Sequence, residues 1–170
     1  MTFLKFLLGL GAALGAHSAL VALVPQLVLA FDPFVVVSVL TALGGNSLGG
    51  LAGGLVAGFA RDTLSGRLYG LHGFADTIIG YATARTAQRM DLQQPGAVWV
   101  VTVLATLVQQ AILVCLSYLL LPRPEVAPPL WVPIQAIVNG FVAMIVWSAA
   151  SRAQGFRQRA ERRKMDRLRL

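Results

Sequence analysis

The sequence is poor in charge, cysteine and histidine, and each shortage argues against a class of function. Only 12% of its 170 residues are Asp, Glu, Lys or Arg, against about 25% in a typical soluble domain. The single cysteine, Cys115, excludes an internal disulfide and a cysteine pair for a metal, and we interpret it as a structural thiol. With only His17 and His72 besides, no metal-ligand spacing or catalytic triad is indicated. We therefore expect neither an enzyme nor a bound cofactor.

What the sequence has instead is a series of long apolar runs. Its mean hydropathy is +0.71, and a helix of about 20 apolar residues crosses a hydrocarbon core about 30 Å thick. We predict an all-helical, six-span membrane bundle in residues 1–152, followed by a basic tail in residues 153–170. The predicted spans cover residues 2–24, 27–43, 44–58, 68–86, 97–121 and 130–150. A cleaved secretory signal is the alternative for the first run, although its apolar residues continue past residues 16–18.

The basic residues gather at one end of the chain. From Arg152 onward, eight Lys and Arg stand against Glu161 and Asp166. With six spans, eleven of the 14 basic residues lie on the side of the two termini, which the positive-inside rule assigns to the cytoplasm. We expect the tail to bind anionic lipids, with an acidic protein partner as the alternative. Nucleic acid is not expected, because Phe156 is the only aromatic residue among these charges.

Glycine is concentrated in one stretch, since ten of the 17 glycines lie in residues 44–73. In a membrane, small residues four apart let two helix backbones approach closely. Two such series run through the third predicted span and indicate two close neighbours: Gly45, Gly49 and Gly53, and then Gly50, Gly54 and Gly58. Residues 61–69 follow as a predicted connecting loop with Asp62, Ser65 and Gly66 as turn formers.

Several polar residues interrupt the predicted spans. Asp32, just before Pro33, is interpreted as a helix cap rather than a functional carboxylate. Asp76 lies four residues after His72 on the same helix face, so His72 is its nearest candidate partner. The other candidates for buried polar positions are Gln109, Gln110, Gln135 and Asn139. Composition favours a packing network over a transport path and leaves both readings open.

The glycine-rich region also carries a family resemblance, which extends over residues 32–89. The run GGLVAGFARDTLSGRLYGLHG, followed by IIGY, resembles the MreD family of rod shape-determining proteins, as does the earlier FDPFVVVSVLTAL. The residues that match the family pattern are Gly58, Phe59, Asp62, Leu64, Ser65, Gly66, Gly70, Leu71, His72, Gly80 and Tyr81. Asp62 is expected to accept backbone donors in the loop or to pair with Arg61 or Arg67. Asp76 departs from the pattern, which is apolar there, so a local partner is expected for it rather than a general role in the family.

The resemblance implies a non-enzymatic scaffold in the bacterial inner membrane that serves cell elongation. Its implied direct partner is MreC, and its implied indirect partners are the RodA glycosyltransferase, a class B penicillin-binding protein and MreB filaments. The family fold is also thought to be similar to the substrate-binding subunits of energy-coupling-factor transporters. That similarity keeps one alternative open, a small-molecule binding or transport subunit with a cavity near Asp76 and His72.

Overall fold

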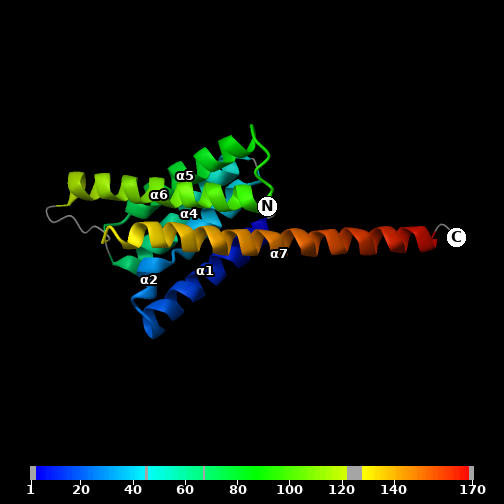
Figure 1. The fold of residues 1–170 in the computed structure, drawn as a ribbon, viewed down its shortest axis with the longest axis horizontal. Coiled ribbons are helices and arrows are strands. Elements are labelled where there is room, and N and C mark those ends of the chain that lie inside the picture. Colours follow the sequence, from blue (N-terminus) through cyan, green and yellow to red (C-terminus); the bar gives the residue numbers. More distant parts are fainter. Residues whose placement is uncertain (1–2, 45, 67, 122–127, 169–170) are drawn as a thin grey trace.

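The computed structural model describes residues 3–44, 46–66, 68–121 and 128–168, with side chains between residues 4 and 153. Every regular element in these ranges is a helix (Figure 1). The order is α1 (Phe3–Leu23), α2 (Leu27–Ala30), α3 (Pro33–Ala42), α4 (Ser47–Ser65), α5 (Leu71–Ala87), α6 (Pro95–Leu120) and α7 (Trp131–Leu168). The prediction of an all-helical chain is confirmed for the described residues.

The second predicted span consists of two helices rather than one. Asp32 has an extended backbone, and its side chain accepts the backbone N–H of Phe34 at 3.1 Å, so it caps α3. Pro33 occupies the first turn of α3, where its missing N–H costs nothing. The resulting α3 is only ten residues long, or roughly 15 Å at 1.5 Å per residue.

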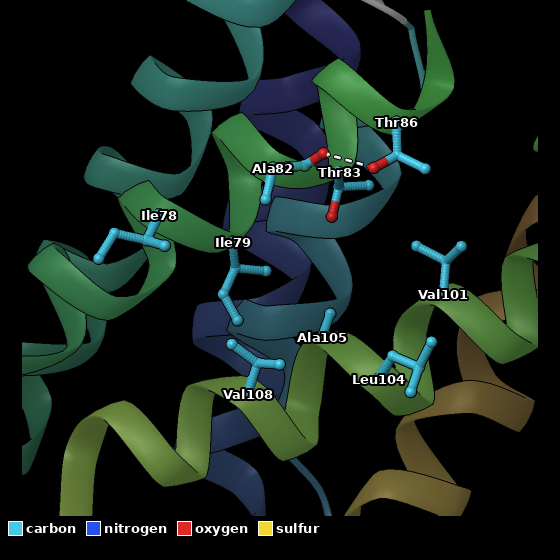
Figure 2. Close-up of a pocket in the computed structure, with 9 residues that line it drawn as sticks. All are labelled: Ile78, Ile79, Ala82, Thr83, Thr86, Val101, Leu104, Ala105 and Val108. Carbon is cyan, nitrogen blue, oxygen red and sulfur yellow. Dashed lines mark hydrogen bonds between the residues drawn. The ribbon is translucent and has the colours of Figure 1, made fainter. Parts of the chain in front are cut away.

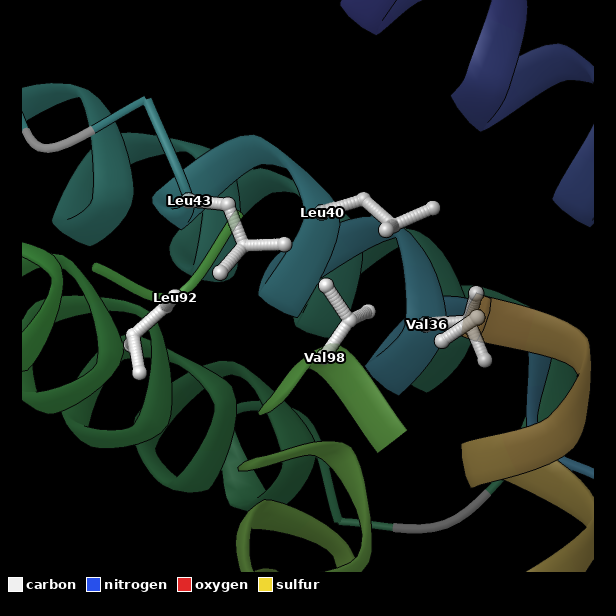
Figure 3. Close-up of a cluster of buried hydrophobic side chains, with 6 residues drawn as sticks. Val36, Leu40, Leu43, Leu92 and Val98 are labelled. Atoms are coloured by element: carbon white, nitrogen blue, oxygen red, sulfur yellow. The ribbon is translucent and has the colours of Figure 1, made fainter. Parts of the chain in front are cut away.

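Short as it is, α3 forms the centre of the bundle. All of its residues except Thr41 are buried, and it contacts α1, α4, α5, α6 and α7. One side of it belongs to a cluster of buried apolar side chains in which Val36 and Leu40 of α3 lie with Leu43, Leu92 and Val98 (Figure 3). A helix with apolar residues all round is typical of such an enclosed position.

The predicted loop at residues 61–69 is wrong in its first half. After its cap at Asn46, α4 continues through Arg61 and Asp62 to Ser65. It ends at Gly66, whose left-handed backbone (φ 63°) is the conformation that glycine adopts at helix ends without strain. The sequence suggested a loop because Arg61 and Asp62 interrupt the apolar run. In the structure both charges are paired inside the bundle. The helix can therefore continue through them without leaving an unpaired buried charge.

Among the residues that the structure describes, three helices are long and apolar enough to cross a membrane: α1 over Leu4–Leu23, α6 over Pro95–Leu120 and α7 over Trp131–Ala153. α6 and the first part of α7 run side by side, while α7 extends far beyond the other helices toward the C-terminus (Figure 1). α7 is therefore one continuous helix across the boundary predicted at residues 152 and 153. The other predicted spans correspond to the short α2 and α3 and to the more polar α4 and α5, and the count of six stays a prediction.

Candidate functional site

The region that the sequence singled out is a tight contact between α4 and α5. A Cβ atom at Gly50, Gly54 or Gly58 would overlap backbone atoms of α5, and at Gly50 it would lie 2.5 Å from the carbonyl oxygen of Gly80. In the other direction, a Cβ atom at Gly80 would lie still closer to the carbonyl oxygen of Gly50. The two helices thus touch backbone to backbone, which only residues without a side chain allow.

Of the other glycine series, Gly45, Gly49 and Gly53, one member meets a neighbouring helix. A Cβ atom at Gly53 would lie 2.8 Å from Cγ2 of Thr41, so Gly53 is the point where α4 meets α3. At Gly49 the nearest atoms belong to Asn46, the cap of the same helix, at an ordinary 3.5 Å. The structure therefore does not support the prediction that Gly49 packs against a neighbouring helix, and Gly45 lies outside the described residues.

Asp62 of α4 holds the beginning of α5. Its carboxylate accepts the backbone N–H groups of Gly70 at 2.9 Å, His72 at 3.2 Å and Gly73 at 3.0 Å. The same carboxylate lies 2.7 Å from Nδ1 of His72, and Asp62 is fully buried. Gly70 stands at the cap position of α5 and has no side chain to satisfy the first N–H groups of the helix. Asp62 supplies that cap from the preceding helix, while Arg61 takes a different partner.

The remaining residues of the family pattern lie in the turn between α4 and α5, in the core or on the surface of the bundle. Ser65 donates its hydroxyl to the Asp62 carbonyl at 3.1 Å, and Gly66 and Gly70 both adopt positive φ. Leu71 is buried at the start of α5. Three large side chains of the pattern point outward from the bundle: Phe59, Leu64 and Tyr81.

An ion pair that the sequence analysis missed lies beside this turn. Arg61 of α4 pairs with Asp32, the cap of α3, and both side chains are largely buried. The backbone N–H of Asp32 donates to Oδ1 of Asn139 in α7 at 2.9 Å. Spacing could not reveal the pair, because 29 residues separate its members. The sequence did hold one indication of the pair, because both charges are near span ends that were predicted to lie on the same side of the membrane.

The buried polar candidates join the later helices. Asn139 of α7 donates to Thr106 of α6 at 3.2 Å, and Gln110 of α6 donates to Gln135 of α7 at 2.5 Å. Thr106 was not among the predicted residues, because a threonine in a membrane helix usually bonds to its own helix, as this one also does to Thr102.

The predicted partner of Asp76 is wrong. His72 shares its helix face but turns to Asp62, whereas Asp76 accepts a hydrogen bond from Nε2 of Gln109 in α6 at 2.6 Å. Asp76 and Gln109 are both fully buried. The shared face was correctly inferred from the spacing, but the partner came from a helix 33 residues away in sequence.

A groove of about 200 Å³ lies between α5 and α6 (Figure 2). Its walls are almost wholly apolar, with Ile78 and Ile79 from α5 and Leu104 and Val108 from α6. Neither Asp76 nor His72 lines this groove. No group of His, Cys, Asp and Glu suited to a metal ion occurs among the residues that the structure describes.

Several helices are apolar and long enough to cross a bilayer, and buried ion pairs and amide hydrogen bonds join the helices of the bundle. These features define a helical membrane protein. The chain belongs to the MreD family, because the family model of rod shape-determining protein MreD matches residues 1–148. This membership places the protein in rod shape determination. We found no significant match to the chain among curated proteins or among solved structures.

Proposed function

We propose that the protein is a non-enzymatic scaffold of the bacterial cell-elongation complex, which binds MreC and links peptidoglycan synthases to the control of cell shape. The family match over residues 1–148 carries this proposal, because it spans the bundle from α1 into α7. The buried polar groups support it, because the side chains of Asp62, Arg61 and Asn139 all form hydrogen bonds to other helices or their caps. Such contacts fix a shape, and a scaffold depends on its shape.

The proposal includes a location and a topology. We expect the inner membrane, six crossings and both termini in the cytoplasm, with α1, α6 and α7 as the long crossings. The excess of basic residues in the tail supports this orientation. The basic tail is then expected to lie against anionic lipid headgroups. The similarity of the family fold to the substrate-binding subunits of energy-coupling-factor transporters remains a prediction.

Co-purification with MreC from the same bacterium tests the partner. The full-length protein and MreC, co-expressed and extracted in mild detergent, are expected to elute as one stoichiometric complex. A matched pair of variants tests whether the complex depends on an intact bundle: Gly54→Leu should disturb the contact between α4 and α5 and weaken the complex, whereas Gly11→Leu adds a side chain where nothing lies within 4 Å. A well-folded wild-type protein that never forms the complex, in detergent or after cross-linking in cells, would remove the main support for the scaffold.

The small-molecule alternative is not favoured by the groove, whose walls do not include Asp76 or His72. A vitamin-like compound that raised the melting temperature of the wild-type protein, but not of Asp76→Asn, would revive it.

A further inference from the structure

We propose that Asp76 and Gln109 form a carboxylic acid–amide pair that holds one proton inside the bundle. One of the two hydrogen bonds of such a pair is present, from Nε2 of Gln109 to Oδ1 of Asp76 at 2.6 Å. The two remaining atoms, Oδ2 of Asp76 and Oε1 of Gln109, are buried without a hydrogen-bond partner. These are the two oxygens that the second hydrogen bond of the pair would use.

The missing element is a donor. An ionised carboxylate and an amide oxygen only accept hydrogen bonds, so neither can satisfy the other. A proton on Oδ2 turns the carboxyl group into a donor, and Oε1 of Gln109 is the acceptor on the same partner side chain. A single proton therefore satisfies two buried atoms, each of which is costly to leave unpaired.

The surrounding charges do not provide another solution. Asp32 at the start of α3 pairs with Arg61 of α4, and Asp62 of α4 pairs with His72 of α5. The neighbouring polar groups of α6 and α7 are uncharged amides and hydroxyls, such as Thr106 and Asn139. No described basic side chain forms an ion pair with Asp76, and a proton removes the unpaired charge from the core.

A cation fits this place less well than a proton. Hard metal ions take about six oxygen ligands, whereas only two buried side-chain oxygens lack a partner at this pair. The third buried oxygen atom without a partner among the described side chains, Oγ1 of Thr41, belongs to α3 rather than to α5 or α6.

The proton has a structural consequence for the groove. Ile79 and Ala105 both line the groove (Figure 2). Ile79 follows Asp76 by about one turn of α5, and Ala105 precedes Gln109 by about one turn of α6, so the pair lies next to the groove along these two helices. Loss of the proton leaves two acceptor oxygens, one from α5 and one from α6, without a donor between them. Proton occupancy is thus linked to how closely α5 and α6 approach.

Infrared spectroscopy of the purified full-length protein at neutral pH tests the proton directly. We expect the C=O stretch of a protonated carboxylic acid, shifted in D₂O, present in the wild type and in the surface control Asp91→Asn, and lost in Asp76→Asn. Gln109→Met should move the band, because the carboxyl group loses its amide partner. Spectra of the wild type and Asp76→Asn that are identical in this region would overturn the proposal.

Thermal melting gives a second readout and separates the rival ligands. Asp76→Asn keeps a neutral polar side chain, so its melting temperature should stay closer to that of the wild type than the melting temperature of Asp76→Leu does. Replacing choline chloride by NaCl at constant ionic strength should change neither wild type nor variant. A sodium-dependent rise confined to the wild type, without the carboxylic acid band, would identify a cation site and overturn the proton. If Asp76→Asn fails to fold, two measurements still test whether Asp76 holds the proton: the isotope shift of the band in the wild type and the position of the band in Gln109→Met.

Discussion

Oδ1 of Asp62, near the end of α4, lies 2.7 Å from Nδ1 of His72 in the first turn of α5. The same carboxylate accepts the backbone N–H groups of Gly70 and Gly73, so one buried side chain determines where α5 begins. A cap supplied by a neighbouring helix ties the two helices together as well as satisfying donors.

Asp62→Ala is therefore expected to destabilise the protein strongly. It removes the cap of α5 and leaves buried N–H groups and His72 without an acceptor, at a cost of roughly 2–4 kcal/mol when the cap and hydrogen-bond losses are combined. Thermal unfolding in detergent, followed by circular dichroism, measures this loss. Asp91→Ala, at an exposed aspartate between α5 and α6, is the control and should change stability little. Equal melting curves for the two variants would contradict the capping role.

The glycines of α4 should differ sharply in their tolerance of a side chain. Gly54→Ala places a methyl group into the backbone of α5 and should cost about 1–3 kcal/mol, the usual range for overpacking. Gly49→Ala meets only Asn46 at an ordinary distance and gains helix propensity of up to about 1 kcal/mol. Melting temperatures of the two purified variants test this contrast. A Gly54→Ala protein as stable as Gly49→Ala would show that α4 and α5 are not in backbone contact.

The Asp32 and Arg61 pair is expected to show strong energetic coupling. Removal of one partner leaves a buried charge uncompensated, which typically costs about 3–5 kcal/mol. Asp32→Asn with Arg61→Gln should cost less than the sum of the single changes, with a coupling energy of about 0.5–3 kcal/mol. A double-mutant cycle from chemical denaturation gives this value. Arg85→Gln, at an exposed position, is the control, and purely additive effects would argue against the ion pair.

Removal of residues 156–170 is expected to leave the bundle folded. Among the side chains that the structure describes, which end at residue 153, the last buried one is Ala143, so these side chains complete their core before the tail begins. The truncated protein should elute as a single peak and melt near the temperature of the full chain. Its binding to vesicles that contain anionic lipid, measured against the full chain, should fall if the tail contacts headgroups. Aggregation of the truncated protein would instead show that the tail takes part in packing.

The six-span topology can be mapped with single cysteines. Cys115→Ser removes the only cysteine and provides the background. In intact cells, a membrane-impermeant thiol reagent should label Tyr69→Cys, between α4 and α5, but not Gln93→Cys, between α5 and α6. Labelling of Gln93→Cys after the membrane is opened confirms that the site is reactive. The reverse pattern would place the termini outside the cytoplasm.

Part of this structure follows from local sequence signals. Hydropathy located α1, α6 and the start of α7 to within a few residues, and the aspartate before Pro33 indicated the cap of α3. These features depend on residues close together in the chain. The end of α4 was misplaced, because the sequence cannot show that Arg61 and Asp62 each have a buried partner elsewhere in the bundle.

By itself, the sequence determined an apolar, helical chain, the glycine-rich stretch and the family to which the protein belongs. Only the tertiary structure decided which glycines face a neighbour and which acid pairs with which base. Gly49 and Gly53 have the same spacing signal, yet only Gly53 meets another helix. Asp76 stands one turn from His72 and is bound by Gln109 instead. Periodicity places a side chain on a helix face, but its partner depends on how distant helices pack against that face.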